Sequence, residues 1–134
     1  MTTAGQTYHA LDKAHDLGYT DTRISHTEWK VNYAGYNIPA AQTADFALLR
    51  SAEVVKAAGY SYFTIEHERS FNVASPGLRL GHHEGGTRSS VVSHKSFPET
   101  DIVVKAQSSK EATGKEVYTT SSTISHLKHK YQLK

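Results

Sequence analysis

Histidine is the residue type with the most chemical potential in this sequence. There are nine histidines, and His82 and His83 stand next to Glu84 within the glycine-rich run GLRLGHHEGG. Imidazole and carboxylate groups bind zinc, so these three residues are the candidate metal ligands. A zinc site needs three or four ligands at fixed separation, however, and an adjacent His-His pair on a loop does not supply them. We therefore favour solvated imidazoles here and expect no cofactor.

A second histidine pair lies near the C-terminus. His126 and His129 are three residues apart and would share a face if this segment is helical. That spacing is compatible with metal binding, but it is also common by chance. It adds no further ligand to the first pair.

Acid-base chemistry needs a carboxylate and an imidazole on the same side of the chain. Glu66, His67 and Glu68 are consecutive, and strand alternation would place the two carboxylates on one face and the imidazole on the other. The sequence contains none of the nucleophile-elbow, zincin, P-loop or dinucleotide-binding patterns. We assign no catalytic residue and expect a protein that is not an enzyme. The alternative is a metal- or small-ligand-dependent enzyme that uses the loop histidines.

Composition and charge narrow the class of protein. The 134 residues match one domain, with 37% hydrophobic and 21% charged residues and a net charge of +2. Fifteen basic against thirteen acidic side chains give no strong field, so we expect no nucleic-acid partner. Cysteine is absent, which excludes disulfides and thiolate chemistry. No stretch reaches the length of a membrane span, and residues 1–18 lack the apolar core of a signal peptide.

The first half of the chain predicts an arm, a hairpin and a helix. Residues 1–17 form an N-terminal arm ahead of a single domain over 18–134. Residues 19–25 and 27–33 read as a β-hairpin with Trp29, Val31 and Tyr33 on one face. A helix begins between residues 37 and 43, because Pro39 is tolerated in a first helical turn but not beyond it. It runs to Ala58, and Gly59 suits a left-handed turn back across the sheet.

The helix pattern predicts which side faces the core. At about 100° per residue, one stripe of mainly small residues faces the sheet, with Leu48 and Val55 as its large side chains. This stripe comprises Ala41, Ala44, Ala47, Leu48, Ser51, Ala52, Val55 and Ala58. Phe46 lies near the exposed side, where Arg50 and Glu53 form a pair one turn apart. The candidate binding surface is therefore Phe46, Arg50, Glu53, Tyr60 and Tyr62.

The second half predicts two strands around a long loop. Residues 60–71 alternate, with Phe63 and Ile65 on one face, and residues 101–107 form a short strand after Pro98. Between them, 72–100 is a long Gly/His-rich loop in which only 89–92 resemble a strand. Residues 117–131 fit a helix and a strand equally well. The expected fold class is α+β, with a mostly antiparallel sheet and one principal helix packed on one face.

Several of these segments together resemble a bacterial family of small envelope lipoproteins of unknown function. The segments are GYTDTRIS, EWKVNYAG, DFALLRSAEVVKAAGYSYFTI, ETDIVVKA and VYTTSSTISHL. Four residues match the family's strand: Trp29, Val31, Tyr33 and Gly35. Residues 47–50 with Ala52 and Glu53 match its helix. The joint that follows is matched by Gly59, Tyr60, Tyr62 and Phe63. The likeness covers roughly residues 18–71 and, more loosely, 99–127.

The resemblance implies a location more than an activity. It implies a periplasmic or outer-membrane-associated protein that contacts the membrane only through a lipid anchor, and this sequence carries neither a leader nor the cysteine for one. It supplies no catalytic residues. We expect a non-enzymatic binding or structural module whose partner is an envelope component or another protein. This hypothesis predicts exposed aromatic side chains around Phe46, Tyr60 and Tyr62; the enzyme alternative predicts that the loop histidines converge with Glu66 and Glu68.

Overall fold

The computed structural model describes residues 8–12, 17–73, 97–110 and 114–133. Its elements run β1 (Gly18–Arg23), β2 (Glu28–Ala34), α1 (Ala40–Ala57), β3 (Tyr62–Asn72), β4 (Pro98–Gln107), β5 (Val117–Thr119) and α2 (Thr120–Lys130). The five strands form one antiparallel sheet in the order β1-β2-β4-β3-β5. The expected α+β fold class is confirmed.

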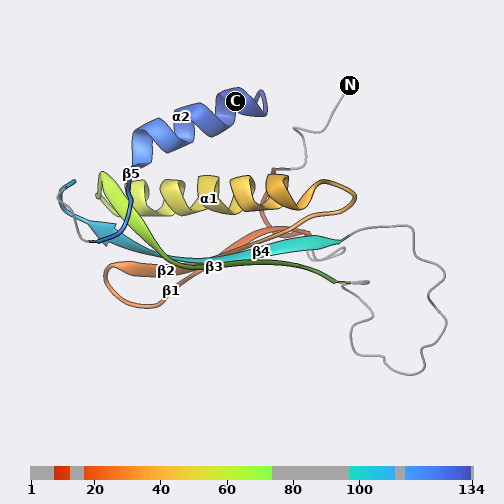
Figure 1. Cartoon of the computed structure of the whole chain (residues 1–134), viewed down its shortest axis with the longest axis horizontal. Helices are drawn as coiled ribbons and strands as arrows, with labels where there is room; N and C mark the ends of the chain where they lie inside the picture. The colour runs from red at the N-terminus through yellow and green to blue at the C-terminus, as the bar shows by residue number, and fades with distance from the viewer. Residues whose placement is uncertain (1–7, 13–16, 74–96, 111–113, 134) are drawn as a thin grey trace.

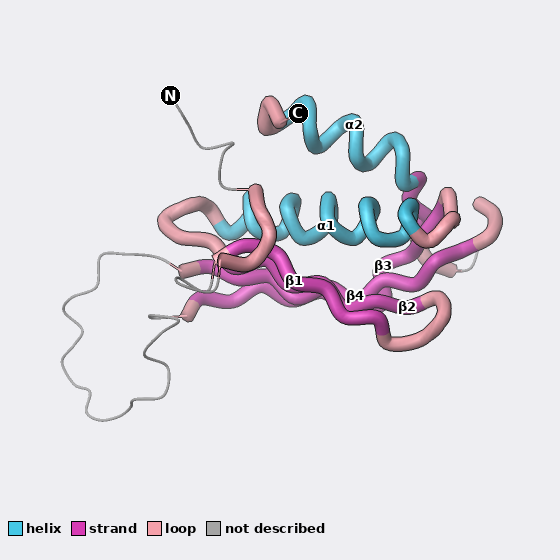
Figure 2. Tube along the Cα trace, turned by 180° about the vertical axis from the view of Figure 1, so that it is seen from behind, coloured by secondary structure: helices cyan, strands magenta, loops and turns pink. Residues whose placement is uncertain are grey.

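The molecule has three layers, which are seen edge-on in Figure 1. The sheet is the first layer, α1 lies along one of its faces, and α2 packs on the far side of α1. The view from behind in Figure 2 shows the same order. No helix or strand among the described residues covers the other face of the sheet, which we call the open face. No described helix combines the length and apolar character that crossing a membrane requires.

The hairpin forms as predicted. β1 pairs with β2 in register from Gly18 opposite Ala34 to Arg23 opposite Trp29. Trp29, Val31 and Tyr33 are all buried against α1 in the core cluster. The period-two alternation therefore identified the core side of this strand correctly.

Both ends of α1 agree with the sequence signals. Pro39 precedes the helix in an extended conformation. Proline has no backbone N–H, but this is tolerated here because the first amides of a helix have no partner within the helix. At the other end Gly59 has a φ of +99°, a backbone conformation that costs glycine little. The chain thereby turns from α1 back into β3.

The predicted core stripe of α1 is only partly right, and the placement of Phe46 is wrong. Ala47, Ser51, Ala52 and Val55 are buried as predicted, whereas Leu48 is only half-buried. Ala41 and Ala58 are exposed. Phe46, Leu49 and Thr43 are each 0% exposed, and Gln42 is buried as well.

The reason is that α1 is the middle layer. Thr43 hydrogen-bonds Thr100 of β4 on the sheet side, while Asp45 accepts a hydrogen bond from Tyr131, next to α2, on another side. The Phe46 ring contacts Tyr33 of β2 and also Tyr131. A helix covered on two sides buries more than one stripe, and a single-stripe pattern did not predict the second cover.

β3 contains an irregularity that the sequence did not predict. Ile65 pairs with Val104 but His67 pairs with Val103, so Glu66 is an extra residue, a β-bulge. Phe63 is buried and Ile65 partly buried, as expected. Thr64, on the opposite face from Phe63, is buried as well, and its hydroxyl donates to Glu66 and accepts from Gln107.

The predicted loop over 72–100 is shorter in the structure, since Asn72 ends β3 and β4 already begins at Pro98. Proline is tolerated at the first residue of a strand. The candidate ligands His82, His83 and Glu84 lie outside the described residues, as does the strand-like segment 89–92. The ambiguous segment 117–131 is both kinds of structure in succession, β5 and then α2.

Part of the N-terminal arm packs onto the domain. The backbone of Tyr19 in β1 donates to His9 and accepts from Leu11. A side chain at Gly18 would come within 2.5 Å of the Ala10 carbonyl oxygen, so this close approach requires glycine. The arm residues 8–12 thus extend the sheet edge beside β1.

Candidate functional site

The strand register gathers charged side chains in the middle of the open face. Lys30 of β2, Val103 of β4 and His67 of β3 form one cross-strand row. In the next row Asn32, Asp101 and Arg69 lie side by side. Because directly opposite residues in antiparallel strands project to the same face, each row is a line of neighbouring side chains.

The bulge at Glu66 turns the side chains of His67 and Arg69 of β3 to the open face. Ile65 lies opposite Val104, which is buried on the α1 side. Without the extra residue, His67 would follow Ile65 to that side by alternation. The bulge places it opposite Val103 instead, and Arg69 then lies opposite Asp101.

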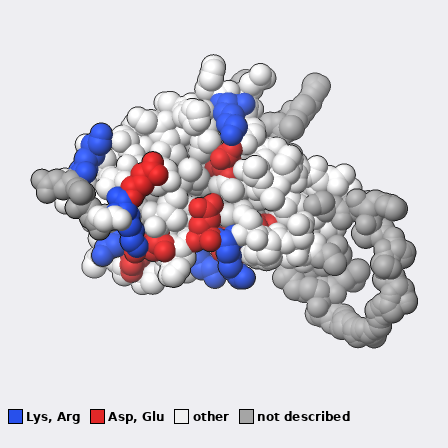
Figure 3. Space-filling model, viewed as in Figure 1, with Lys and Arg blue, Asp and Glu red and all other residues white. Residues whose placement is uncertain are grey.

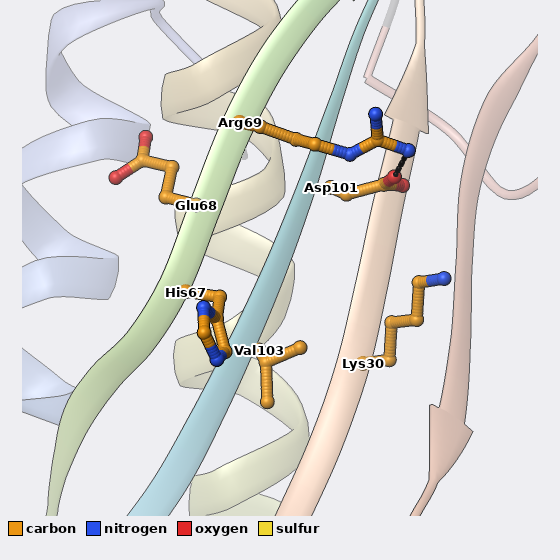
Figure 4. Close-up of a pocket in the computed structure, with 6 residues that line it drawn as sticks. All are labelled: Lys30, His67, Glu68, Arg69, Asp101 and Val103. Carbon is orange, nitrogen blue, oxygen red and sulfur yellow. Dashed lines mark hydrogen bonds and ion pairs between the residues drawn. The ribbon is translucent and has the colours of Figure 1, made fainter.

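These rows surround a hollow of about 400 Å³. Figure 4 shows it with the helices behind the sheet and the labelled side chains mostly in front. Val103 lies between Lys30 and His67, and the Arg69 side chain crosses β4 toward Asp101. Glu68 also borders the hollow, but its carboxylate points to the outer side of β3, away from Asp101 and Lys30.

The Asp101 carboxylate is held at both oxygens. Asn32 Nδ2 donates to Oδ1 over 2.7 Å, and Arg69 Nη2 donates to Oδ2 over 3.1 Å. The same Asn32 amide also donates to Glu99, at 3.2 Å. The guanidinium of Arg69 lies 4.6 Å from the centre of the Phe71 ring, close enough for a cation-π contact. Arg69 therefore has a defined orientation although its side chain is 71% exposed.

Glu66 and Glu68 do not form the acid-base group that the enzyme alternative requires. Glu66 accepts hydrogen bonds from Thr64 and from Lys115. The Thr64 hydroxyl, with help from Lys115, lowers the pKa of Glu66. Glu68 lies instead beside Tyr118, whose pKa is raised by burial and by the nearby carboxylates of Glu116 and Glu68. The bulge separates the two glutamates that simple alternation would place together.

The predicted binding surface on α1 is not one surface. Phe46 is fully buried. Tyr60 and Tyr62 are half-buried beyond the C-terminal end of the helix, and Phe46 is eleven residues before that end, or about 16 Å along the axis. The predicted cluster of exposed aromatic side chains around these three residues does not form.

Arg50 and Glu53 hold β1 and the N-terminal arm to α1. Arg50 pairs with Asp21 at 2.9 Å and with Glu53 at 3.4 Å, and its guanidinium lies 4.3 Å from the centre of the Tyr19 ring. Glu53 also accepts a hydrogen bond from the Tyr8 hydroxyl. Burial alone would lower the pKa of Arg50, but the bond and charge of Asp21 outweigh it and raise that pKa. These contacts give both residues a structural role.

Metal binding gains no support from the described part of the chain. No group of three or more histidine, cysteine or carboxylate side chains there could hold a metal ion. His126 and His129 are exposed on α2.

In comparisons with protein-family models, with curated proteins and with solved structures, none matches this chain. The functional argument therefore depends on the geometry of the open face. Sequence reasoning missed this site because its members come from three strands and a bulge. The one signal in the sequence was that residues 66–70 are all polar, whereas a strand with one buried face would continue to alternate apolar and polar residues.

Proposed function

We propose that this chain is a non-enzymatic binding module that holds an envelope component against the open face of its sheet. One observation carries the proposal: two helices are stacked on one face of the sheet, while the other face presents an ordered set of charged side chains around a hollow. Folding requires only one buried face in an antiparallel sheet. A second face with fixed charged groups is therefore available for a ligand.

The arrangement supports binding better than catalysis. A general base needs a carboxylate or imidazole that is free to take a proton from the substrate. Both oxygens of Asp101 are already hydrogen-bonded, and the Glu68 carboxylate points away from the hollow. What remains at the hollow is Lys30, Arg69 and the His67 imidazole, and neither carboxylate of the lining is directed at that imidazole to orient it as a base. This set suits recognition better than catalysis. The alternative enzyme would use His82 and His83, which lie outside the described residues.

The partner that we propose is an envelope component rather than nucleic acid. Positive and negative side chains are interspersed over the surface seen in Figure 3, without the single basic field that a polyanionic duplex requires. The bacterial envelope location comes from the resemblance. In this proposal the protein is periplasmic or outer-membrane-associated, with a lipid anchor as its contact with the membrane.

A steric block of the hollow tests the proposal. Val103→Trp should fill the hollow without changing charge, and tryptophan is favourable in strands. We expect the wild type to sediment with purified bacterial peptidoglycan or outer-membrane vesicles, and the variant to lose about tenfold or more in affinity. Ala57→Trp, an exposed position at the end of α1 on the opposite side of the sheet, is the control. Equal binding by the two variants would contradict the proposal.

A further inference from the structure

Arg69 is prepared for an anion before any ligand arrives. The Asp101 carboxylate and the Phe71 ring fix its guanidinium from two sides. A guanidinium has five N–H donors. Within the described residues, Arg69 uses one of them, at Nη2, for its hydrogen bond to Asp101. Because the side chain is already oriented, less conformational entropy is lost when a ligand uses its other donors.

Lys30 and His67 are the other donors around the hollow. They lie on the two strands that flank β4, opposite the same residue, Val103. Two interstrand spacings put their backbones about 9.6 Å apart, and Arg69 is two residues further along β3 than His67. An ammonium, an imidazole N–H and a guanidinium thus border a half-buried apolar side chain.

The acidic groups nearby do not cancel these donors. Asp101 and Arg69 neutralise each other in their ion pair, Asn32 also donates to Asp101, and Glu68 points to the other side of β3. This leaves Lys30 as the uncompensated charge, with the remaining N–H groups of Arg69 as hydrogen-bond donors. Among the described residues no ion pair joins Lys30 to a carboxylate of the lining, and its side chain extends toward β1 in Figure 4. The hollow therefore favours a ligand with negative charge.

On these grounds we infer that the open face recognises an anionic group of its ligand, a phosphate or a carboxylate, held by Lys30, His67 and Arg69. This inference rests on the proposed function and names the ligand chemistry for the same site. A volume of about 400 Å³ is within the range of small-molecule sites. It has room for one anionic unit, such as a sugar phosphate or a sugar acid, with its apolar side against Val103.

Anion titration followed by ¹H–¹⁵N NMR tests the inference on the whole chain. The probes are inorganic phosphate and glucuronate, each compared with sodium chloride at the same ionic strength. We expect saturable shifts confined to the backbone amides of residues 30, 67, 69 and 103. The phosphate and glucuronate titrations also show which of the two anions is preferred.

Two substitutions and a control separate a site from general charge. Lys30→Gln and Arg69→Gln should each weaken the apparent affinity for the preferred anion about fivefold or more, because each removes a charged hydrogen-bond donor. Lys56→Gln makes the same charge change on the exposed surface of α1 and should leave the affinity unchanged. Shifts spread evenly over surface lysines, or insensitive to Lys30→Gln, would overturn the inference.

The ligand chemistry and the proposed function fail in different ways. If Val103→Trp abolishes binding to the envelope fractions but neither anion produces saturable shifts, the inference of an anionic ligand is wrong. The proposal that the open face binds an envelope component is then retained. If both anions bind at the hollow while Val103→Trp binds the envelope fractions normally, the proposed function is wrong and the anion site stands.

Discussion

At the scale of single residues, two tyrosines are bound to carboxylates inside the helical layer. Tyr8 donates to Glu53, and Tyr131 donates to Asp45. Both rings contact Phe46 edge-on, at centroid distances of 5.1 and 5.0 Å. These bonds join segments 45 and 86 residues apart in sequence. They hold the arm and the C-terminal end of α2 to α1.

These two hydroxyls make stability sensitive to alkaline pH. Burial, and then the hydrogen bond to Glu53, raise the pKa of Tyr8; burial and Asp45 do the same for Tyr131. A tyrosine in the unfolded chain has a pKa near 10. A folded-state pKa above this value means that the stability is fully present below pH 10 and is lost as the pH rises beyond it.

Tyr8→Phe separates the hydrogen bond from the ring. At pH 7 we expect a loss of about 1–3 kcal/mol in the free energy of unfolding, because the hydrogen bond to the Glu53 carboxylate disappears while the ring contacts remain. Above pH 10 the wild type should lose stability faster than the variant, so that the difference narrows. Urea denaturation from pH 7 to 11 measures both effects. Tyr62→Phe, whose hydroxyl has no hydrogen bond within the described residues, is the control and should show neither effect.

Sequence reasoning could not assign the roles of Arg50 and Glu53. It recognised a pair one turn apart on the side of the helix away from the predicted core. Their other partners, Asp21 and Tyr8, come from β1 and from the arm, and a helical pattern contains no information on distant segments. The polarity of this side therefore predicts an exposed binding surface. In the structure the same two residues hold β1 and the arm to α1.

At the scale of elements, α1 shows what a periodic pattern can and cannot predict. Its limits followed from Pro39 and Gly59, which act locally through fixed or permissive φ values. Its buried side did not follow, because α2 and the arm cover a side that the pattern left open. Phe46, for example, contacts Tyr8 of the arm and Tyr131 at the end of α2 as well as Tyr33 of the sheet. In β3, likewise, alternation identified Phe63 as core but could not predict the bulge, which depends on the partner strand.

Two adjacent leucines test this reading of α1. Leu49 is fully buried, whereas Leu48 is half-buried. Leu49→Ala should cost about 3 kcal/mol in the free energy of unfolding, because it leaves a cavity between layers, and Leu48→Ala should cost about 1 kcal/mol. Urea denaturation of the pair measures the difference with the same side chain removed in the same helix. A larger loss for Leu48→Ala would support the single-stripe arrangement and contradict the burial of Leu49 in the structure.

At the scale of the whole molecule, one edge of the sheet is formed by the part of β3 that β5 does not cover. β3 has eleven residues, but β5 pairs only with Tyr62, Phe63 and Thr64. Within the described residues, the rest of β3 from Ile65 to Asn72 is paired with β4 alone. Unpaired edges bind other strands unless charges or bulges prevent it. This edge has both, in the bulge at Glu66 and the charged side chains of Glu66, Glu68 and Arg69.

We therefore expect the wild type to remain monomeric. When the charges on this edge of β3 are removed, we expect it to pair with the same edge of a second molecule. Glu66→Val combined with Glu68→Val creates the segment TIVHVRSF, whose β-branched residues favour strand pairing. Light scattering after size-exclusion chromatography should show association that grows with concentration. Glu28→Val combined with Glu116→Val removes the same charge from outside this edge and should stay monomeric. Association of both double variants would attribute the effect to net charge, whereas association of the wild type would mean that the edge is an interface rather than a protected border.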